Sequence, residues 1–419
     1  MPRRSGPCAL LALALLLGCR ERPTGDRVLL VGIDAATWDV IRPMMTEGKL
    51  PTLSGLVRTG WSATLESIEP TLSPAIWTTI ATGQRPAVHG ITGFLAPGPD
   101  GREIPVTSNV RRREPLWAIA SRHERSVNVV GWYVTWPVEP VKGVMVSDRF
   151  VDADRGELVG GGSQSLSREH PGVYPAELTP ELEKLFVRAD RFIDPYEREF
   201  HRQFKAYPVD ATRTAIAERL MRERPADLTL VYLWGVDPIQ HHFWKYHQPE
   251  TWPGPPLPPA EVELNRNKVR DYYADTDAFL GRLVADAGPR VTVVVVSDHG
   301  AGPLLTYDPT NPVSGDHRLD GIVVIAGNHA RHAAGNRKAS ILDITPTVLY
   351  LLGLPVGRDM EGRVLEDAID PGFLAANPPR AIATHEVRAH DAQEKPEAAV
   401  PTDADERIKE RLKSLGYLR

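Results

Sequence analysis

The chain has 419 residues, of which 42% are hydrophobic and 25% charged, a composition typical of a folded soluble protein and not of a disordered or multi-spanning one. This length allows one large domain with elaborations or two modest domains. The formal net charge of −5 gives no electrostatic basis for binding nucleic acid, and we expect no such partner.

The N-terminus has the pattern of an export signal. Two arginines precede an unbroken apolar run, Ala9 to Leu17, which is shorter than the ~20 residues that a membrane-spanning helix needs. The run ends in Leu-Leu-Gly-Cys, which resembles the lipobox of bacterial lipoproteins. We predict a signal peptide over residues 1–18, a lipidated Cys19 and a tether over residues 19–26. The protein is then an exported bacterial lipoprotein, anchored to a membrane at the periplasmic face or the cell surface; a plain secretion signal is the alternative.

Apolar runs rich in β-branched residues predict five buried strands, at residues 28–33, 127–130, 228–233, 291–296 and 322–325. Helical patterns lie between them, at residues 116–121, 211–222 and 271–286. Near-continuous apolar runs suit a parallel sheet that is covered on both faces. The predicted fold class is therefore α/β, a three-layer sandwich with one large, mostly parallel sheet, in a domain over residues 27–371.

Two regions break this rhythm. Residues from about 135 to 209 are rich in Gly, Pro, Arg and aromatics, and we predict an inserted cap there, with a surface excursion without function as the alternative. Residues 372–401 are polar and rich in Pro and Ala, which predicts a linker. Residues 402–419 then predict a short helix that begins with a Thr402/Asp405 capping box and docks on the main domain.

Acidic and imidazole side chains flank four of the predicted strands. They are Asp34 after the first strand, Asp237 and His241 after the third, Asp298 and His299 after the fourth, and His317 before the fifth. Ligands of open α/β sheets bind outside the carboxyl ends of the strands, so we expect these groups to converge. Imidazole with carboxylate suits zinc, with manganese or iron as the alternatives. Six ligands are too many for one tetrahedral zinc, and we predict two metal ions with room for substrate.

The stretch "PTLSPAIWTTIATG" places a serine at the start of a helical pattern. Ser73 directly precedes Pro74, and proline is favoured at the first helical position with serine just before it. Taken alone, the stretch favours a hydroxyl that caps the helix. Beside a metal site the same place favours a nucleophile, because a helix N-terminus and a bound cation both stabilise an alkoxide. Thr71, two residues upstream, is the rival nucleophile.

The ordered set of motifs resembles the alkaline phosphatase superfamily, most of all its type I phosphodiesterase/nucleotide pyrophosphatase branch. "TLSPAIWTTIATGQRPAVHGI" is similar to the nucleophile segment of that branch, and "DITPTVLYLLGLPVGRDMEGRVL" to the end of its domain, so the resemblance covers residues 28–365. The resemblance implies hydrolysis of phosphate esters through a covalent phospho-serine or nucleotidyl-serine, which water then releases. The ligand sets that it implies are Asp237, His241 and His317 for one zinc, and Asp34, Asp298 and His299, together with Ser73, for the other.

The chain departs from that branch at two positions. The better-known nucleotide pyrophosphatases have threonine where this chain has Ser73, and they have asparagine 21 residues later, where this chain has Phe94. Pro74 has no backbone N–H to replace the lost donor, which leaves nucleotide specificity open. The expected substrate is a small phosphorylated molecule. Candidate contacts to its leaving group, with plain packing as the alternative, are Trp132, Tyr133, Trp136, Arg149, Trp244 and Tyr246.

Other functions remain open at this point. A phosphomonoesterase or phosphonate hydrolase of the same superfamily is the nearest alternative. A sulfatase needs arginine four residues after its modified Cys or Ser, whereas Ser73 is followed by Pro-Ala-Ile-Trp. The alternative from a different class is a non-catalytic surface lipoprotein that binds a ligand, and the metal content of the purified protein distinguishes it from an enzyme.

Overall fold

The computed structural model describes residues 26–151, 171–191, 205–311, 313–333, 337–387, 397–414 and 416–418, with positions 194, 197 and 200. The predicted signal peptide, the lipobox cysteine and nearly all of the tether lie outside these residues. Within the described ranges, no helix has the length and apolar character that a transmembrane segment requires.

A nine-stranded sheet forms the middle of the molecule. Its order is β13 (Lys338–Ser340), β2 (Trp61–Glu66), β12 (Asp320–Gly327), β9 (Val291–Val296), β1 (Arg27–Ile33), β8 (Leu228–Leu233), β5 (Val127–Val130), β6 (Gly143–Val146) and β7 (Val173–Tyr174). The strands from β9 to β6 are parallel, whereas β12 runs antiparallel to both of its neighbours and β7 runs antiparallel to β6. The sheet is therefore mostly parallel, as the apolar runs predict.

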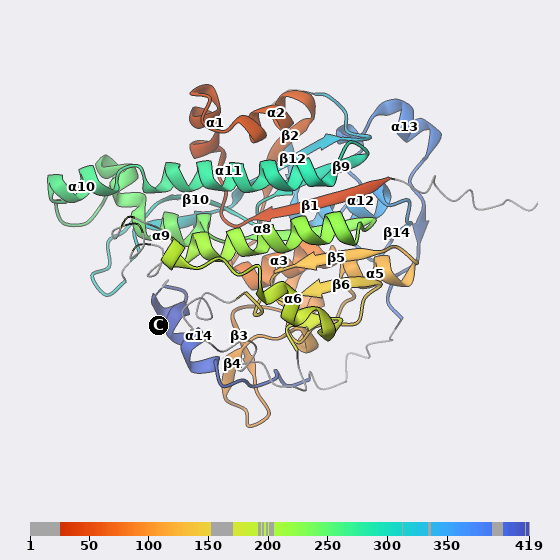
Figure 1. Cartoon of the computed structure of the whole chain (residues 1–419), viewed down its shortest axis with the longest axis horizontal. Helices are drawn as coiled ribbons and strands as arrows, with labels where there is room; N and C mark the ends of the chain where they lie inside the picture. The colour runs from red at the N-terminus through yellow and green to blue at the C-terminus, as the bar shows by residue number, and fades with distance from the viewer. Residues whose placement is uncertain are drawn as a thin grey trace, which may run out of the picture.

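Helices cover both faces of this sheet (Figure 1). One face carries α1 (Trp38–Thr46), α2 (Pro51–Thr59), α8 (Ala206–Glu223), α9 (Val236–His247) and α11 (Lys268–Ala287), and the other carries α3 (Ser73–Thr82), α5 (Leu116–Arg122) and α12 (Ile344–Leu351). Side chains of β1 alternate between the two cores, because Leu29 and Val31 pack with the first set and Leu30 with the second. The predicted three-layer α/β architecture is confirmed.

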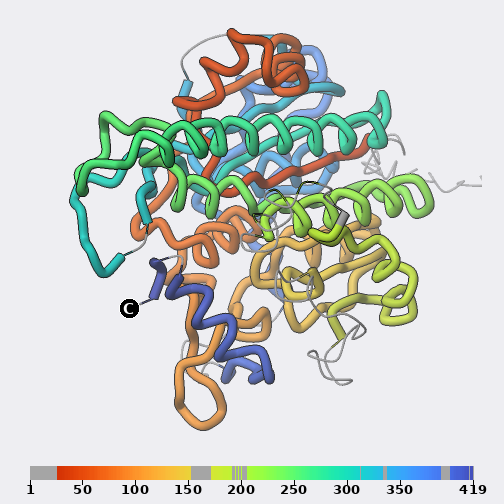
Figure 2. Tube along the Cα trace, turned by 60° about the vertical axis from the view of Figure 1, so that its left-hand side comes forward, coloured from red at the N-terminus to blue at the C-terminus, as the bar shows by residue number. Residues whose placement is uncertain are grey.

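Smaller elements surround the sandwich. Three two-stranded ribbons pair β3 (Leu95–Pro97) with β4 (Glu103–Pro105), β10 (Gly300–Pro303) with β11 (Gly315–Arg318), and β14 (Val356–Gly357) with β15 (Ala381–Ile382). The remaining α-helices are α4 (Pro86–His89), α6 (Thr179–Glu183), α10 (Pro259–Asn265), α13 (Pro371–Ala376) and α14 (Asp405–Ser414). Short 3₁₀ helices are η1 (Ser108–Val110), η3 (Ala176–Leu178), η4 (Ala189–Arg191), η5 (Pro249–Thr251), η6 (Ile341–Asp343) and η7 (Glu366–Ala368). Figure 2 shows α14, in blue, beside the β3–β4 ribbon, in orange.

Short regular elements lie within the two regions that the sequence sets apart. Part of the region predicted as a cap, residues 135–209, extends the sheet edge as β6 and β7. The predicted linker, residues 372–401, holds most of α13 and the strand β15. The role of the region as a cap, and the other domain bounds, stay predictions.

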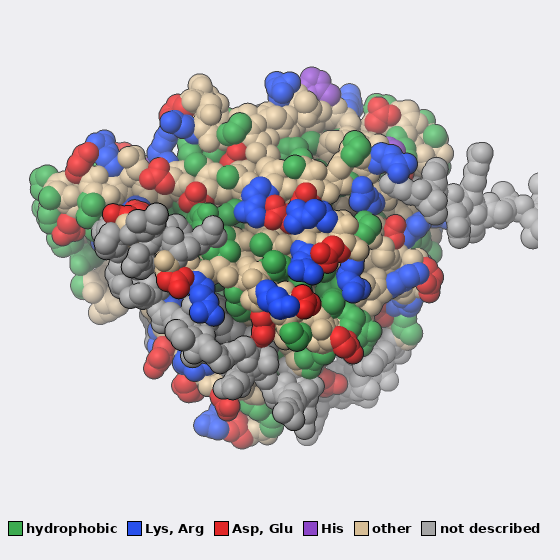
Figure 3. Space-filling model, viewed as in Figure 1, with side chains coloured by type: hydrophobic (Ala, Val, Ile, Leu, Met, Phe, Trp, Pro, Cys, Tyr) green, Lys and Arg blue, Asp and Glu red, His purple; other side chains and the backbone are tan. Residues whose placement is uncertain are grey.

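The surface shown in Figure 3 mixes charges of both signs. Ion pairs link the two long helices of the first face, since Arg222 on α8 contacts Asp286 on α11, and Arg282 on α11 contacts Glu218 on α8. Pairs of this kind are typical of a solvated surface and contribute little stability individually.

Candidate active site

The fold brings the predicted acidic and imidazole groups to one edge of the sheet. Asp34 follows β1, Asp237 is the second residue of α9 after β8, and Asp298 with His299 follows β9. These three strands are parallel neighbours, so their carboxyl ends meet. His317 lies in β11, ahead of β12, and the antiparallel direction of β12 brings its beginning to the same edge.

The turn between β8 and α9 is held by a buried carboxylate. Asp210 on α8 accepts hydrogen bonds from the backbone N–H groups of Trp234 (2.8 Å) and Gly235 (2.9 Å), and from the hydroxyl of Tyr272 (2.9 Å). A Cβ on Gly235 would lie 1.9 Å from that hydroxyl oxygen, so the turn needs glycine. Asp237, two residues later, is thereby held in place at the sheet edge.

The first of two clusters consists of Asp237, His241 and His317. The two imidazole Nε2 atoms lie 2.9 Å apart, and the Asp237 Oδ1 atom lies 3.2 Å from Nε2 of His241 and 3.4 Å from Nε2 of His317. The Nδ1 atom of His241 lies 2.9 Å from the carbonyl oxygen of Gly315, and that of His317 lies 2.8 Å from the carbonyl oxygen of Thr71. A carbonyl only accepts, so each Nδ1 carries the proton and each Nε2 offers a lone pair.

The second cluster consists of Asp34, Asp298 and His299. The His299 Nε2 atom lies 3.3 Å from Oδ2 of Asp298 and 3.6 Å from Oδ1 of Asp34. Its Nδ1 atom lies 3.0 Å from the carbonyl oxygen of Gly300, which leaves Nε2 as the acceptor here too. The Tyr232 hydroxyl donates to the other oxygen of Asp34.

The donor set of the two clusters fits divalent cations. Four buried atoms of this edge have no hydrogen-bond partner among the described residues: Oδ1 of Asp34, Oδ1 of Asp237, Oδ2 of Asp298 and Nε2 of His299. Buried acceptors that face one another without a donor are unstable unless a cation lies among them. The group Asp34, Asp298 and His299 and the group Asp237, His299 and His317 each have donor atoms within 4.8 Å of one another. The two groups share His299, whose single free Nε2 can serve only one ion, and the Nε2 of His241, 2.9 Å from that of His317, is the imidazole available to the other.

The electrostatics of the site reflect this crowding of like charges. Burial raises the pKa of Asp34 well above its ordinary value, and the charges of Asp298 and Asp237 raise it further. Burial also raises the pKa of Asp298 to about 8. Burial lowers the pKa of His299 well below its ordinary value, and the charge of His317 acts in the same direction. For Asp237 burial opposes ionisation, yet the imidazoles of His241 and His317, when protonated, lower its pKa well below the ordinary value.

Ser73 begins α3, and its hydroxyl does not cap the helix. The N-cap residue is Leu72, and no side chain makes a capping hydrogen bond, so the interpretation of Ser73 as a simple cap is wrong. The Ser73 side chain lines the same pocket as Asp34 and Asp237. Thr71, the rival nucleophile, contacts His317 through its carbonyl oxygen, and its hydroxyl oxygen lies 3.3 Å from the same Nδ1 atom. The position of Thr71 is that of a residue that orients His317.

Comparison with known proteins now decides the family. A family profile described as type I phosphodiesterase/nucleotide pyrophosphatase matches residues 28–352. The chain belongs to this family. It is therefore a hydrolase of phosphoric ester bonds. Among curated proteins, none shows significant sequence similarity to the chain.

Solved structures of low sequence identity share the fold. Human ectonucleotide pyrophosphatase/phosphodiesterase 5 superposes with a TM-score of 0.51 at 14% identity, over 82% of this chain and 100% of that one. Its murine counterpart, solved in complex with AMP, gives 0.51 at 13% identity, over 82% and 100%. The alkaline phosphatase PafA gives 0.51 at 13% identity, over 83% and 100%. The fold is that of the alkaline phosphatase superfamily.

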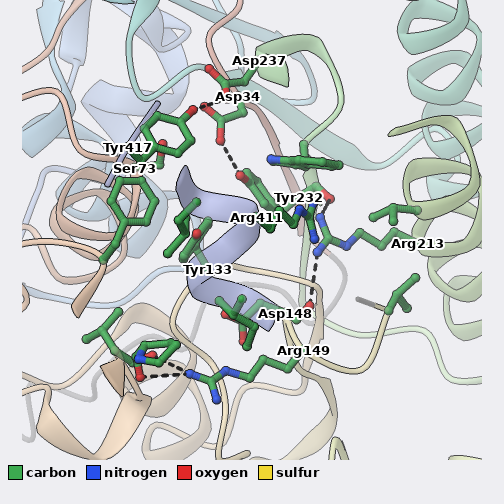
Figure 4. Close-up of a pocket in the computed structure, with 18 residues that line it drawn as sticks. Asp34, Ser73, Tyr133, Asp148, Arg149, Arg213, Tyr232, Asp237, Arg411 and Tyr417 are labelled. Carbon is green, nitrogen blue, oxygen red and sulfur yellow. Dashed lines mark hydrogen bonds between the residues drawn. The ribbon is translucent and has the colours of Figure 1, made fainter. Parts of the chain in front are cut away.

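The pocket that Asp34, Ser73 and Asp237 line has a cavity volume of about 110 Å³. Figure 4 shows Ser73, Asp34, Asp237 and Tyr417 at one end and Arg149 at the other. Of the aromatic and basic residues singled out from the sequence, only Tyr133 and Arg149 line this pocket. Three other residues of that set, Trp132, Trp136 and Trp244, are fully buried in the core and do not line the pocket.

The sequence did not reveal several residues of the pocket wall. Tyr232 points from β8 to Asp34, and Arg213 on α8 donates to the carbonyl oxygens of Tyr232 (3.3 Å) and Asp148 (3.4 Å). Arg411 and Tyr417 come from the C-terminal segment. Nothing local in the sequence marks these residues, since β8 is buried along its whole length and Tyr232 does not stand out in it. Phe94, where the family's asparagine would stand, also lines the pocket.

Proposed function

We propose that the chain is a metal-dependent phosphodiesterase that acts through a covalent phospho-serine intermediate on Ser73. The observation that carries this proposal is a group of four buried acceptor atoms, of Asp34, Asp237, Asp298 and His299, that accept no hydrogen bond from the described residues. Two of these residues, Asp34 and Asp237, line the same pocket as Ser73 at the start of α3. Buried acceptors in this arrangement are stabilised by bound cations. A serine beside such cations can act as a nucleophile, because they lower the pKa of its hydroxyl.

Two divalent ions, for which zinc is the best match, would be held by Asp237, His241 and His317 and by Asp34, Asp298 and His299. When bound, such ions lower the pKa of a serine hydroxyl and stabilise charge on phosphoryl oxygens. The backbone carbonyls on the three Nδ1 atoms keep each Nε2 directed at the site. The chain therefore supplies a preorganised donor set, and its ligands do not have to reorient on binding.

Ser73 supplies the covalent chemistry. Its Oγ atom forms a bond to phosphorus while the bond from phosphorus to the leaving oxygen breaks, and the serine proton ends on solvent or the departing oxygen. Water then attacks the phosphorus of the phospho-serine, the Oγ–P bond breaks, and Ser73 regains a proton. The first turn of α3 offers the oxyanion the Ser73 N–H and the positive end of the helix dipole, because Pro74 has no N–H and that of Ala75 donates to the Leu72 carbonyl (2.9 Å).

The shape of the pocket supports a phosphodiester substrate with a small second ester group. At the end where Ser73 lies, the wall is formed by the rings of Phe94 and Tyr417 and by the carboxylates of Asp34 and Asp237, whereas Arg149 lies at the opposite end (Figure 4). A single negative charge on phosphorus suits such a wall better than the two charges of a monoester. The AMP bound to the murine neighbour supports a small phosphorylated molecule as ligand. A phosphomonoesterase stays the second candidate.

The deciding experiment compares the small diester methyl p-nitrophenyl phosphate with the monoester p-nitrophenyl phosphate, with the metal content of each preparation measured alongside. We expect metal-dependent turnover with the diester preferred, and a loss of at least about 1,000-fold in Ser73→Ala, as for other activated nucleophiles. Thr71→Val is the matched control, because it removes the rival hydroxyl and keeps the carbonyl that orients His317. Full activity in Ser73→Ala, or a larger loss in Thr71→Val, contradicts the assignment of the nucleophile.

We also propose that Cys19 carries a lipid that anchors the enzyme to a membrane facing away from the cytoplasm. The support is the sequence alone, a short apolar run that ends in Leu-Leu-Gly-Cys. Cys19→Ala should release the protein from the membrane fraction and abolish labelling with radioactive palmitate. Retention of label in this variant would exclude Cys19 as the lipidation site.

A further inference from the structure

The C-terminal segment, residues 402–414 and 416–418, is anchored against the pocket at several points. Thr402 donates from its backbone N–H to the Asp405 carboxylate (3.0 Å), and its hydroxyl donates to the same group (2.6 Å), which fixes the start of α14. A guanidinium nitrogen of Arg149 lies 4.0 Å from the Asp405 carboxylate, and the Arg411 guanidinium lies 4.1 Å above the ring of Trp234. The segment therefore contacts both ends of the pocket.

The end of α14 aims one side chain at the metal-ligand clusters. Gly416 has a φ of +80°, its N–H donates to the carbonyl of Lys413 (2.9 Å), and the N–H of Tyr417 donates to the carbonyl of Leu412 (2.9 Å). This pair of bonds around a left-handed glycine is a Schellman motif, which ends the helix and fixes the direction of the next residue. That residue is Tyr417.

Tyr417 reaches the first cluster with both its ring and its hydroxyl. The hydroxyl donates to Oδ2 of Asp237, while the opposite oxygen, Oδ1, faces His241 and His317. The ring stacks on Phe94, with centroids 4.6 Å apart and planes inclined by 25°. The ring centroid also lies 5.4 Å from that of His241, nearly perpendicular to it.

We infer that the C-terminal segment is part of the active site, in which Tyr417 is a positioning residue for Asp237 and a wall of the substrate pocket. A carboxylate that ligates a metal through one oxygen is oriented by a donor on the other, and Tyr417 is the donor that the structure provides. The stacked rings of Tyr417 and Phe94 narrow the Ser73 end of the pocket and limit the size of the group next to phosphorus. The role of Tyr417 as a wall for substrate rests on the proposed function. Its role in positioning Asp237 rests on the geometry alone.

Zinc binding tests the positioning role without any turnover. The full mature chain, stripped with a chelator, is titrated with zinc in competition with a chromogenic chelator, for wild type and Tyr417→Phe. This variant keeps the ring on Phe94 and removes only the hydroxyl, so we expect zinc affinity to fall by roughly 10- to 100-fold. The matched control is Tyr246→Phe, which removes a hydroxyl that donates to Glu261 (3.0 Å) outside the pocket and should leave zinc affinity unchanged. Unchanged affinity in Tyr417→Phe overturns the positioning role, and so does tighter binding, which would mean that the hydroxyl competes with the metal.

The role of Tyr417 as a wall of the substrate pocket is tested by comparing diesters of different size. Tyr417→Ala should raise the ratio of kcat/KM for a bulky diester, such as bis-p-nitrophenyl phosphate, over that for a methyl p-nitrophenyl diester, whereas Tyr417→Phe should not. A ratio equal to the wild-type ratio in Tyr417→Ala overturns the wall, provided that its thermal melt shows a folded protein. If the wild-type enzyme turns over neither diester, the proposed function fails, and the zinc titration still decides the role of Tyr417.

Discussion

Replacing Asp298 by asparagine should stabilise the metal-free protein, although it removes a proposed metal ligand. The Asp298 carboxylate is completely buried, and its pKa is raised from 3.8 to about 8, first by burial. A raised carboxyl pKa means that the folded chain destabilises the charged form. The shift of about four units, at about 1.4 kcal/mol each, corresponds to a cost of about 5 kcal/mol above pH 8, where the carboxyl is ionised in both states.

The local geometry suits asparagine. Its oxygen can keep the hydrogen bond from the Ala35 N–H (3.2 Å), and its NH₂ group can donate to Nε2 of His299 in place of an oxygen 3.3 Å away. The destabilisation of the wild type by ionised Asp298 shrinks as the pH falls from about 8 towards 4, because Asp298 is protonated in the folded chain at a higher pH than in the unfolded chain. The difference between the two proteins should therefore be largest at pH 9, about 3 kcal/mol at pH 6, and near zero at pH 4.

The assay is urea unfolding with chelator present at pH 9, 6 and 4, for wild type and Asp298→Asn. Excess zinc at pH 8 should reverse the order of stabilities, because a ligand that binds only the folded state stabilises the protein that retains its ligands. The reasoning is refuted if Asp298→Asn is no more stable than wild type at pH 9 without metal, or if the difference does not change with pH. The control Asp403→Asn, at an exposed carboxylate, should show neither effect.

Two further predictions concern the frame of the site. Gly235→Ala places a Cβ 1.9 Å from the Tyr272 hydroxyl, so it should lower the free energy of unfolding by about 1–3 kcal/mol and reduce zinc affinity; an unchanged urea midpoint would contradict the role of this turn. Trp132 is completely buried and donates from its indole N–H to the Trp77 carbonyl (3.3 Å), so Trp132→Ala should cost about 3–5 kcal/mol in urea unfolding. Its KM, measured well below the melting temperature, should stay at the wild-type value, and a large rise in KM would restore Trp132 as a substrate contact.

Strand-forming runs and the residues at their ends were readable from the sequence. The runs at 28–33, 228–233 and 291–296 became adjacent parallel strands, and the acidic groups that follow them meet at one edge. The reason is local, because a buried strand between two helical layers needs continuous apolar residues, and a charge directly after it needs a partner or a ligand. The pattern around Ser73 likewise predicted the start of a helix within one residue.

Other features depend on contacts between distant parts of the chain. The antiparallel direction of β12, which brings His317 to the edge, is set by pairing with β2 and β9 and leaves no mark in its own apolar run. The carbonyl of Thr71 orients His317 across 246 positions, and Tyr417 reaches Asp237 across 180.

The sequence by itself thus determined the sheet, the family motifs and the candidate ligands. Only the tertiary structure decided what surrounds them: that the Ser73 hydroxyl caps no helix, that Trp132 belongs to the core, and that the C-terminal helix lines the pocket. The physical reason is the distance along the chain over which residues interact. Periodicity and strand ends reflect the burial of neighbouring residues, whereas the donor on a ligand and the wall of a pocket come from whichever segment the completed fold places there.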